Sequence, residues 1–119
     1  MSESILDSIK KLLGIEAEYT QFDQDITLHI NSIFAVLYQV GGIDQSAVFS
    51  ITSKEETWDQ AIKGQDQINM VKSYMYARVR LLFDPPQTSF GIEALKEQAK
   101  ELEVRLNYLE DLFVIPEPV

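Results

Sequence analysis

The chain has 119 residues, the length of one ordinary domain, and its 45% hydrophobic and 24% charged residues are typical of a globular protein. Nineteen acidic and ten basic side chains give a formal net charge of −9, which disfavours non-specific binding to nucleic acid and to anionic membrane surfaces. The absence of cysteine excludes disulfides, thiolate nucleophiles and Cys-based zinc sites.

The first third of the chain predicts two helices. Ser2 or Ser4 can cap a short helix with an apolar side, and Gly14 ends it. Lys10 and Lys11 lie near the C-terminal end of that helix, where cations interact favourably with the helix dipole. A second helix begins at Thr20 or Asp23 and ends at Gly41-Gly42. Apolar residues cover more than half of its circumference, which predicts burial on several sides. The acidic start of the chain differs from a signal peptide and no apolar run reaches the ~18 residues of a membrane span, so we expect an intracellular protein.

The segment that follows is the least helical. Val48, Phe49 and Ile51 belong to a run of alternating character, which predicts an ordered loop or a lone strand that could pair with another chain. Ser53 and Glu56 have the spacing of a capping box for a short helix through Ile62.

The second half of the chain predicts two longer helices joined by a sharp turn. One runs from about Gln65 to Phe83 with Leu82 on its apolar face, and the sequence Asp84-Pro85-Pro86 ends it. Ser89 can cap the last helix, whose apolar residues from Ile92 to Phe113 alternate spacings of three and four, as in a heptad seam. Residues 114–119 contain two prolines and predict an extended arm.

These elements predict an all-α protein, a small bundle of about four to five helices with a long C-terminal helix and an extended C-terminal arm. Neither an internal repeat nor a domain linker is evident. We therefore expect a single helical domain over residues 1–113 and a tail over residues 114–119.

The sequence offers no convincing set of catalytic or metal-binding residues. His29 is the only histidine, and a boundary histidine touching Asp25 is a simpler interpretation than a pH-sensitive contact. The carboxylates of Glu55, Glu56 and Asp59 cluster where acids favour a helix N-terminus, and no metal-binding loop is matched. We therefore predict that the protein is not an enzyme and that it needs no cofactor or metal.

Two features exceed what a monomer needs. The heptad seam of the last helix is best explained by core packing, although such a seam could also meet a neighbouring subunit. The apolar tail could be a frayed terminus, but its side chains are of the kind that dock into a partner. The docking candidates are Phe113, Val114, Ile115 and Val119.

Several segments, in order along nearly the whole chain, match the pattern of one known family. The block from Arg80 to Pro86 is the most specific, and the others are residues 5–15, 22–26, 29–32, 56–58, 70–74 and 93–107. In these segments the chain resembles the phage head–tail connector family, also described as neck, adaptor or head-completion proteins.

The resemblance implies a structural virion protein of phages and prophages. Such a subunit forms a ring of identical copies beneath the portal protein after DNA packaging, extends the DNA channel and offers a platform to the next neck or tail protein. It implies assembly in the host cytoplasm and a final place in the virion neck, with genomic DNA passing through without specific binding and without a membrane partner. An acidic lumen would repel phosphate.

The resemblance also suggests roles for individual residues. The tail from Phe113 to Val119 is the portal-docking candidate, and the segment with Val48, Phe49 and Ile51 is a candidate subunit or tail-side contact. The turn residues are assigned to structure and not to a contact. They are Arg80, Phe83, Asp84, Pro85 and Pro86.

Two other functions remain open at this point. A small acidic regulatory or inhibitor protein would use its negative surface to bind a basic protein partner, and it would not need the tail. A hydrolase would use a carboxylate pair such as Glu55 and Asp59.

Overall fold

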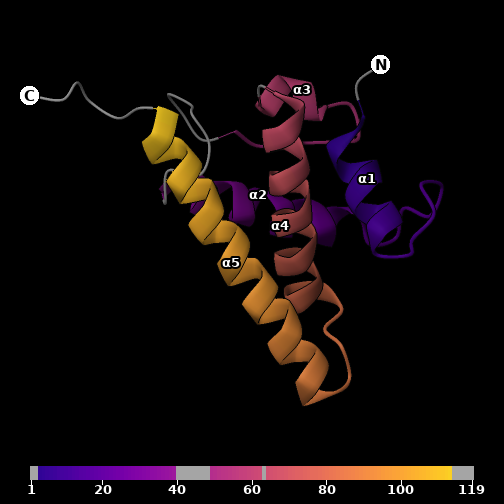
Figure 1. Cartoon of the computed structure of the whole chain (residues 1–119). Helices are drawn as coiled ribbons and strands as arrows, with labels where there is room; N and C mark the ends of the chain where they lie inside the picture. Colours follow the sequence, from indigo (N-terminus) through magenta and orange to yellow (C-terminus); the bar gives the residue numbers. More distant parts are fainter. Residues whose placement is uncertain (1–2, 40–48, 63, 114–119) are drawn as a thin grey trace, which may run out of the picture.

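The computed structural model describes residues 3–39, 49–62 and 64–113, with side chains up to residue 106. Within these ranges the chain forms five helices and no strand, which confirms the predicted all-α class. The helices are α1 (Ile5–Leu12), α2 (Asp23–Gln39), α3 (Trp58–Ala61), α4 (Gln65–Phe83) and α5 (Ser89–Phe113). Figure 1 shows α4 in the centre of the molecule, with α1 on one side, α5 on the other and α2 crossing behind.

The core is formed where the apolar sides of α1, α2 and α4 meet around Trp58. The Trp58 side chain is buried, and its Nε1 donates a hydrogen bond of 2.8 Å to Ser8 Oγ, which itself donates to the Ile5 carbonyl. The indole is thus satisfied in an apolar environment. The helical residues buried there include Ile5, Ile9, Ile26, Ile30, Phe34, Leu37, Val71, Met75 and Val79.

Two short extended pieces fix the start of α1 beside α3. The Ile5 amide donates to the Glu56 carbonyl at 3.0 Å, and the Trp58 amide donates to the Glu3 carbonyl at 3.2 Å. Ser4 Oγ accepts from the Asp7 amide at 3.1 Å and caps α1, as one of the two predicted serines.

The short helix begins later than the sequence predicts. Its N-cap is Thr57, and the Thr57 amide donates to Gln60 Oε1, so the capping box is Thr57–Gln60 and not Ser53–Glu56. The Glu56 carboxylate does accept from the Ser53 amide, which is half of the predicted box, and it also accepts from Thr52. No helix starts at Ser53, because the Glu56 carbonyl accepts from the Ile5 amide.

Helices α4 and α5 form a long antiparallel hairpin. Thr88, and not Ser89, caps α5, because Thr88 Oγ1 accepts from the Gly91 amide at 3.0 Å. Gly91 is required by close packing, since a Cβ there would lie 2.9 Å from Pro86 Cβ. Leu95, Ala99 and Leu106 of the heptad seam are buried, so the seam contributes to core packing within this chain.

The least expected feature is a fully buried lysine. The Lys10 side chain has 0% exposure, and its ammonium lies 3.0 Å from the Ala17 carbonyl, 2.7 Å from the Tyr19 carbonyl and 2.7 Å from Asp23 Oδ1. The sequence placed Lys10 near the C-terminal end of its helix, and the structure confirms that position in the last turn of α1, but the burial was not predicted. The ammonium holds the loop between α1 and α2 against both helices, because a buried charge must find oxygen partners.

We predict that Lys10→Met lowers the free energy of unfolding by about 3 kcal/mol, because it leaves a carboxylate and two carbonyls without their cation. Urea denaturation measures this difference. Lys11→Met is the matched control, since Lys11 is exposed on the same helix, and its effect should stay within about 0.5 kcal/mol. Equal effects of the two variants would show that the Lys10 ammonium does not hold the loop.

Candidate functional site

The predicted contact residues divide between described and undescribed parts of the chain. Val48, the Phe113 side chain and the tail residues Val114, Ile115 and Val119 lie outside the described residues. Phe49 and Ile51 are described, and both face this chain's own core.

An asparagine side chain provides the pairing partner of the extended segment. Asn31 of α2 donates through Nδ2 to the Ile51 carbonyl at 2.9 Å, and the Ile51 amide donates to Asn31 Oδ1 at 2.7 Å. Ile51 is 2% exposed, and the ring of half-buried Phe49 packs edge-on against Phe34 with centroids 5.4 Å apart. The alternating pattern thus reflects an extended segment that pairs with a helix side chain.

The turn motif lies at the junction of α4 and α5. The Asp84 amide donates to the Arg80 carbonyl at 2.8 Å, and Arg80 Nε donates back to the Asp84 carbonyl at 3.3 Å. Half-buried Phe83 packs edge-on against Phe22, with centroids 5.3 Å apart. Phe83 also contacts the His29 ring at 6.4 Å, so His29 meets an aromatic ring and forms no ion pair with Asp25.

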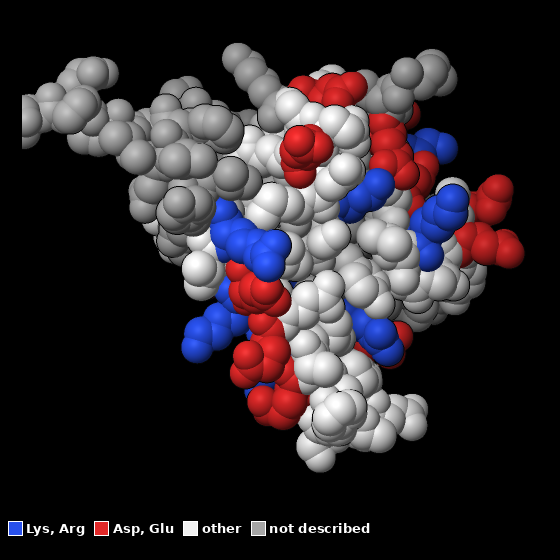
Figure 2. All heavy atoms as spheres, viewed as in Figure 1, with Lys and Arg blue, Asp and Glu red and all other residues white. Residues whose placement is uncertain are grey.

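At this end of the molecule the hairpin of α4 and α5 extends past α1 and α2, as Figure 1 shows. Phe90 is 85% exposed there, and Leu82 is 54% exposed although the sequence placed it on the buried face of its helix. The lowest part of the hairpin carries uncharged side chains in the face shown in Figure 2. Leu82 is exposed because the buried face of α4 continues from Val79 to Phe83, which contacts Phe22, and not to Leu82.

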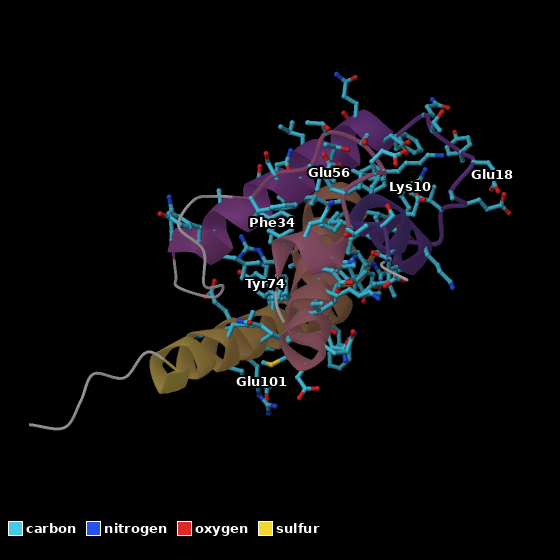
Figure 3. The ribbon with its side chains drawn as sticks, turned by 90° about the horizontal axis from the view of Figure 1, so that it is seen from above. Lys10, Glu18, Phe34, Glu56, Tyr74 and Glu101 are labelled. Carbon is cyan, nitrogen blue, oxygen red and sulfur yellow. The ribbon has the colours of Figure 1, made fainter. Side chains whose placement is uncertain are left out.

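A polar cluster lies between α4 and α5. The Tyr74 hydroxyl donates to Glu103 Oε2 at 2.9 Å and accepts from Arg78 at 2.6 Å. The Arg78 guanidinium lies 5.6 Å from the centre of the Tyr74 ring and 3.9 Å from the Glu103 carboxylate. Figure 3 shows Tyr74 in the interior of the molecule, on the side of α5 away from Glu101. The recess beside the cluster is lined by Tyr74, Arg78, Leu81, Lys96, Ala99, Lys100 and Glu103.

The Tyr74 phenol is stabilised in its neutral form. Burial raises its pKa, and the hydrogen bond to Glu103 raises it further, while Arg78 opposes both effects; the pKa reaches about 12. The phenol stays protonated at neutral pH, so it donates to Glu103 and does not act as a general base. Its oxygen accepts from Arg78, and the cluster therefore orients the Arg78 guanidinium.

The acidic cluster near α3 stabilises a loop. Desolvation is the largest single influence and raises the pKa of Glu56, but the hydrogen bonds from Thr52 and Ser53 together lower it more, so the net shift is downward. The Glu56 carboxylate therefore remains ionised as a loop acceptor. Within residues 3–39, 49–62 and 64–113, no group of three or more acidic or histidine side chains could hold a metal ion. In the same residues, no helix is long and apolar enough to cross a membrane.

The comparison with protein families decides the identity of the chain. Residues 5–112 match the model of the phage connector protein family. The chain belongs to this family. The match includes all of α1 to α4 and all but the last residue of α5, so the core, the turn and the hairpin are those of a phage connector protein. No curated protein sequence and no solved structure matches the connector chain.

We predict that Asn31→Ala lowers the free energy of unfolding of the connector by about 2 kcal/mol, because it removes both hydrogen bonds that hold Ile51. Chemical denaturation provides the value. Asn69→Ala serves as the control, since exposed Asn69 bonds only to the exposed Gln65 side chain on its own helix. A loss for Asn31→Ala no larger than that of the control would contradict the pairing.

We also predict that connector stability falls between about pH 10 and pH 12 through Tyr74. The unfolded phenol loses its proton near its ordinary pKa of 10.0, whereas the folded one keeps it to about 12, so the unfolded state binds fewer protons in this interval. Stability due to Tyr74 is therefore complete below pH 10 and is lost as pH rises through 12. Denaturant titrations across this range should show a smaller decline for Tyr74→Phe. Ultraviolet titration should assign the late tyrosinate signal to Tyr74, and its persistence in Tyr74→Phe would refute the assignment.

Proposed function

We propose that this connector is a non-enzymatic ring subunit of the phage neck, placed between the portal vertex and the next neck or tail protein. The ring extends the DNA channel and completes the head after packaging, and its subunits are in the host cytoplasm until they join the virion. The observation that carries the proposal is the family match over residues 5–112.

The described structure is compatible with a structural component. Three of its polar groups are engaged in the fold, namely the Lys10 ammonium, the Glu56 carboxylate and the Tyr74 cluster. The net charge of −9 suits a protein around a DNA channel, because a negative lumen repels phosphate and lets DNA pass without adhering. The same charge gives no support to direct DNA binding.

In this proposal two segments of the connector contact its partners. The tail from Phe113 to Val119 docks on the portal protein, since it offers apolar side chains on a segment that cannot continue the helix. The segment with Val48, Phe49 and Ile51 is the proposed subunit or tail-side contact. Ile51 is buried in its own chain, so half-buried Phe49 is the described side chain that a neighbour could reach there.

The decisive experiment is co-sedimentation of the purified protein with tailless, DNA-filled phage heads that carry a portal, followed by electron microscopy of the vertex. We expect added density in a ring at the portal vertex. Heads without a portal are the control, and a folded protein that binds neither sample would overturn the proposed function.

We predict that truncation after Leu112 leaves the fold intact but abolishes attachment to portal-containing heads, because it removes the apolar docking residues. Circular dichroism and the urea midpoint test the fold, and the sedimentation assay tests attachment. A truncated chain that joins heads as well as the full chain would eliminate the docking role of the tail.

A further inference from the structure

The recess between α4 and α5 is a basic site in an acidic protein. It combines Arg78, Lys96 and Lys100 beside a single acid, Glu103. The Arg78 guanidinium is held by the Tyr74 hydroxyl and ring, and these and Glu103 at 3.9 Å engage only part of its donor fork. Its 32% exposure allows a further contact.

The two lysines of the recess have little compensation within their own chain. Lys100 is exposed and forms no ion pair with any residue in 3–39, 49–62 or 64–106. Lys96 has one partner, Glu93, at 3.9 Å, and both side chains are more than half exposed. Such a pair contributes little to stability, so the lysine can exchange it for a better one.

A fixed acidic loop lies on the other side of the molecule. Lys10 binds the carbonyls of Ala17 and Tyr19, the residues on both sides of Glu18. The buried ammonium therefore holds the backbone while the Glu18 side chain points into solvent, as Figure 3 shows. Glu16 and Glu18 are exposed and form no ion pair with the described residues.

The two surfaces cannot meet within one chain. The acidic loop lies beyond α1 and the basic recess lies against α5, with α4 between them in both ribbon views (Figures 1 and 3). Opposite charges on opposite sides favour a head-to-tail contact between copies, and such contacts close into rings when the rotation between copies permits. We infer that the loop with Glu16 and Glu18 of one copy binds the recess with Arg78, Lys96 and Lys100 of the next.

This contact rests on the proposed function in one respect, because the ring is the assembly in which it would form. The partner is a second copy of this chain, and the chemistry is carboxylate recognition by ammonium and guanidinium groups. Because Lys10 already orders the acidic loop and Tyr74 already orients Arg78, less conformational freedom is lost on binding than for mobile side chains.

A carbodiimide tests the contact, because it joins a carboxylate to an amine in direct contact without a spacer. An equal mixture of normal and heavy-nitrogen protein, concentrated at low ionic strength, identifies links between copies by their mixed isotope masses. We expect mixed links from Glu16 or Glu18 to Lys96 or Lys100. The neighbouring pair Glu93 and Lys96 should form a link within one chain and shows that the reagent is active.

Charge reversal gives the sharper comparison. E16K/E18K and K96E/K100E each lack one of the two reacting groups, so neither variant alone can form these links; we expect a mixture of both variants to restore them with the two groups exchanged. E55K/D66K is the matched control, because it reverses two exposed acids elsewhere and makes the chain less acidic by the same amount as E16K/E18K. Its links should be undiminished.

Absence of the mixed links while Glu93 and Lys96 react, or mixed links that join other residues, would overturn the inferred contact. Failure of the two-variant mixture to restore the exchanged links, or loss of the original links in E55K/D66K, would do the same, because the links would then depend on net charge alone. The sedimentation assay separates this result from the neck function. If the heads bind the protein but the links are absent, the contact is overturned and the neck function stands. If the links form in solution but the heads do not bind, the neck function is overturned and the contact stands.

Discussion

The packing of α4 on two sides is the constraint on which the rest of the structure depends. On one side α4 faces α1 and α2, where Lys72 pairs with Glu3 and Phe83 contacts Phe22. On the other side it faces α5, where Tyr74 and Arg78 meet Glu103. A helix covered on both sides separates the flanks of the molecule, so the loop with Glu16 and Glu18 and the recess between α4 and α5 present different charges to different neighbours.

A buried cation defines the shape of one of those flanks. Burial of an ammonium is unfavourable unless oxygen atoms replace its water, and Lys10 finds three of them in one loop and the start of α2. The loop must therefore adopt the conformation that brings these oxygens together. Because the Lys10 ammonium needs these oxygens, residues 13–22 must follow one specific path. That path fixes the place of Glu18 on the surface.

The helices could be predicted from the sequence, whereas several details that join them could not. The second, fourth and last helices have strong apolar periodicity, and Pro85-Pro86 marks their sharpest boundary. The predicted start of α3 was wrong because the Glu56 carbonyl accepts a hydrogen bond from the Ile5 amide. This contact spans about fifty residues of chain, so no local pattern shows it. The burial of Lys10 could not be predicted for a related reason, since a lysine at a helix end has the same local pattern whether its ammonium reaches solvent or a carbonyl. The connector family was recognised from its segments, but the basic recess was not predicted, because it needs α4 and α5 side by side.

The acidity of the chain bears on how the proposed ring assembles. Each copy carries a net charge of −9, so copies in free solution repel one another over distances set by the salt concentration. A few complementary contacts between a fixed acidic loop and a basic recess oppose this repulsion only weakly. Attachment of each copy to a common partner raises the local concentration of its neighbours and makes the weak contact sufficient. On this argument, acidity keeps the contact between free subunits weak, so that it needs concentrated protein, and the head supplies the template that makes the head-to-tail contact sufficient at lower concentration.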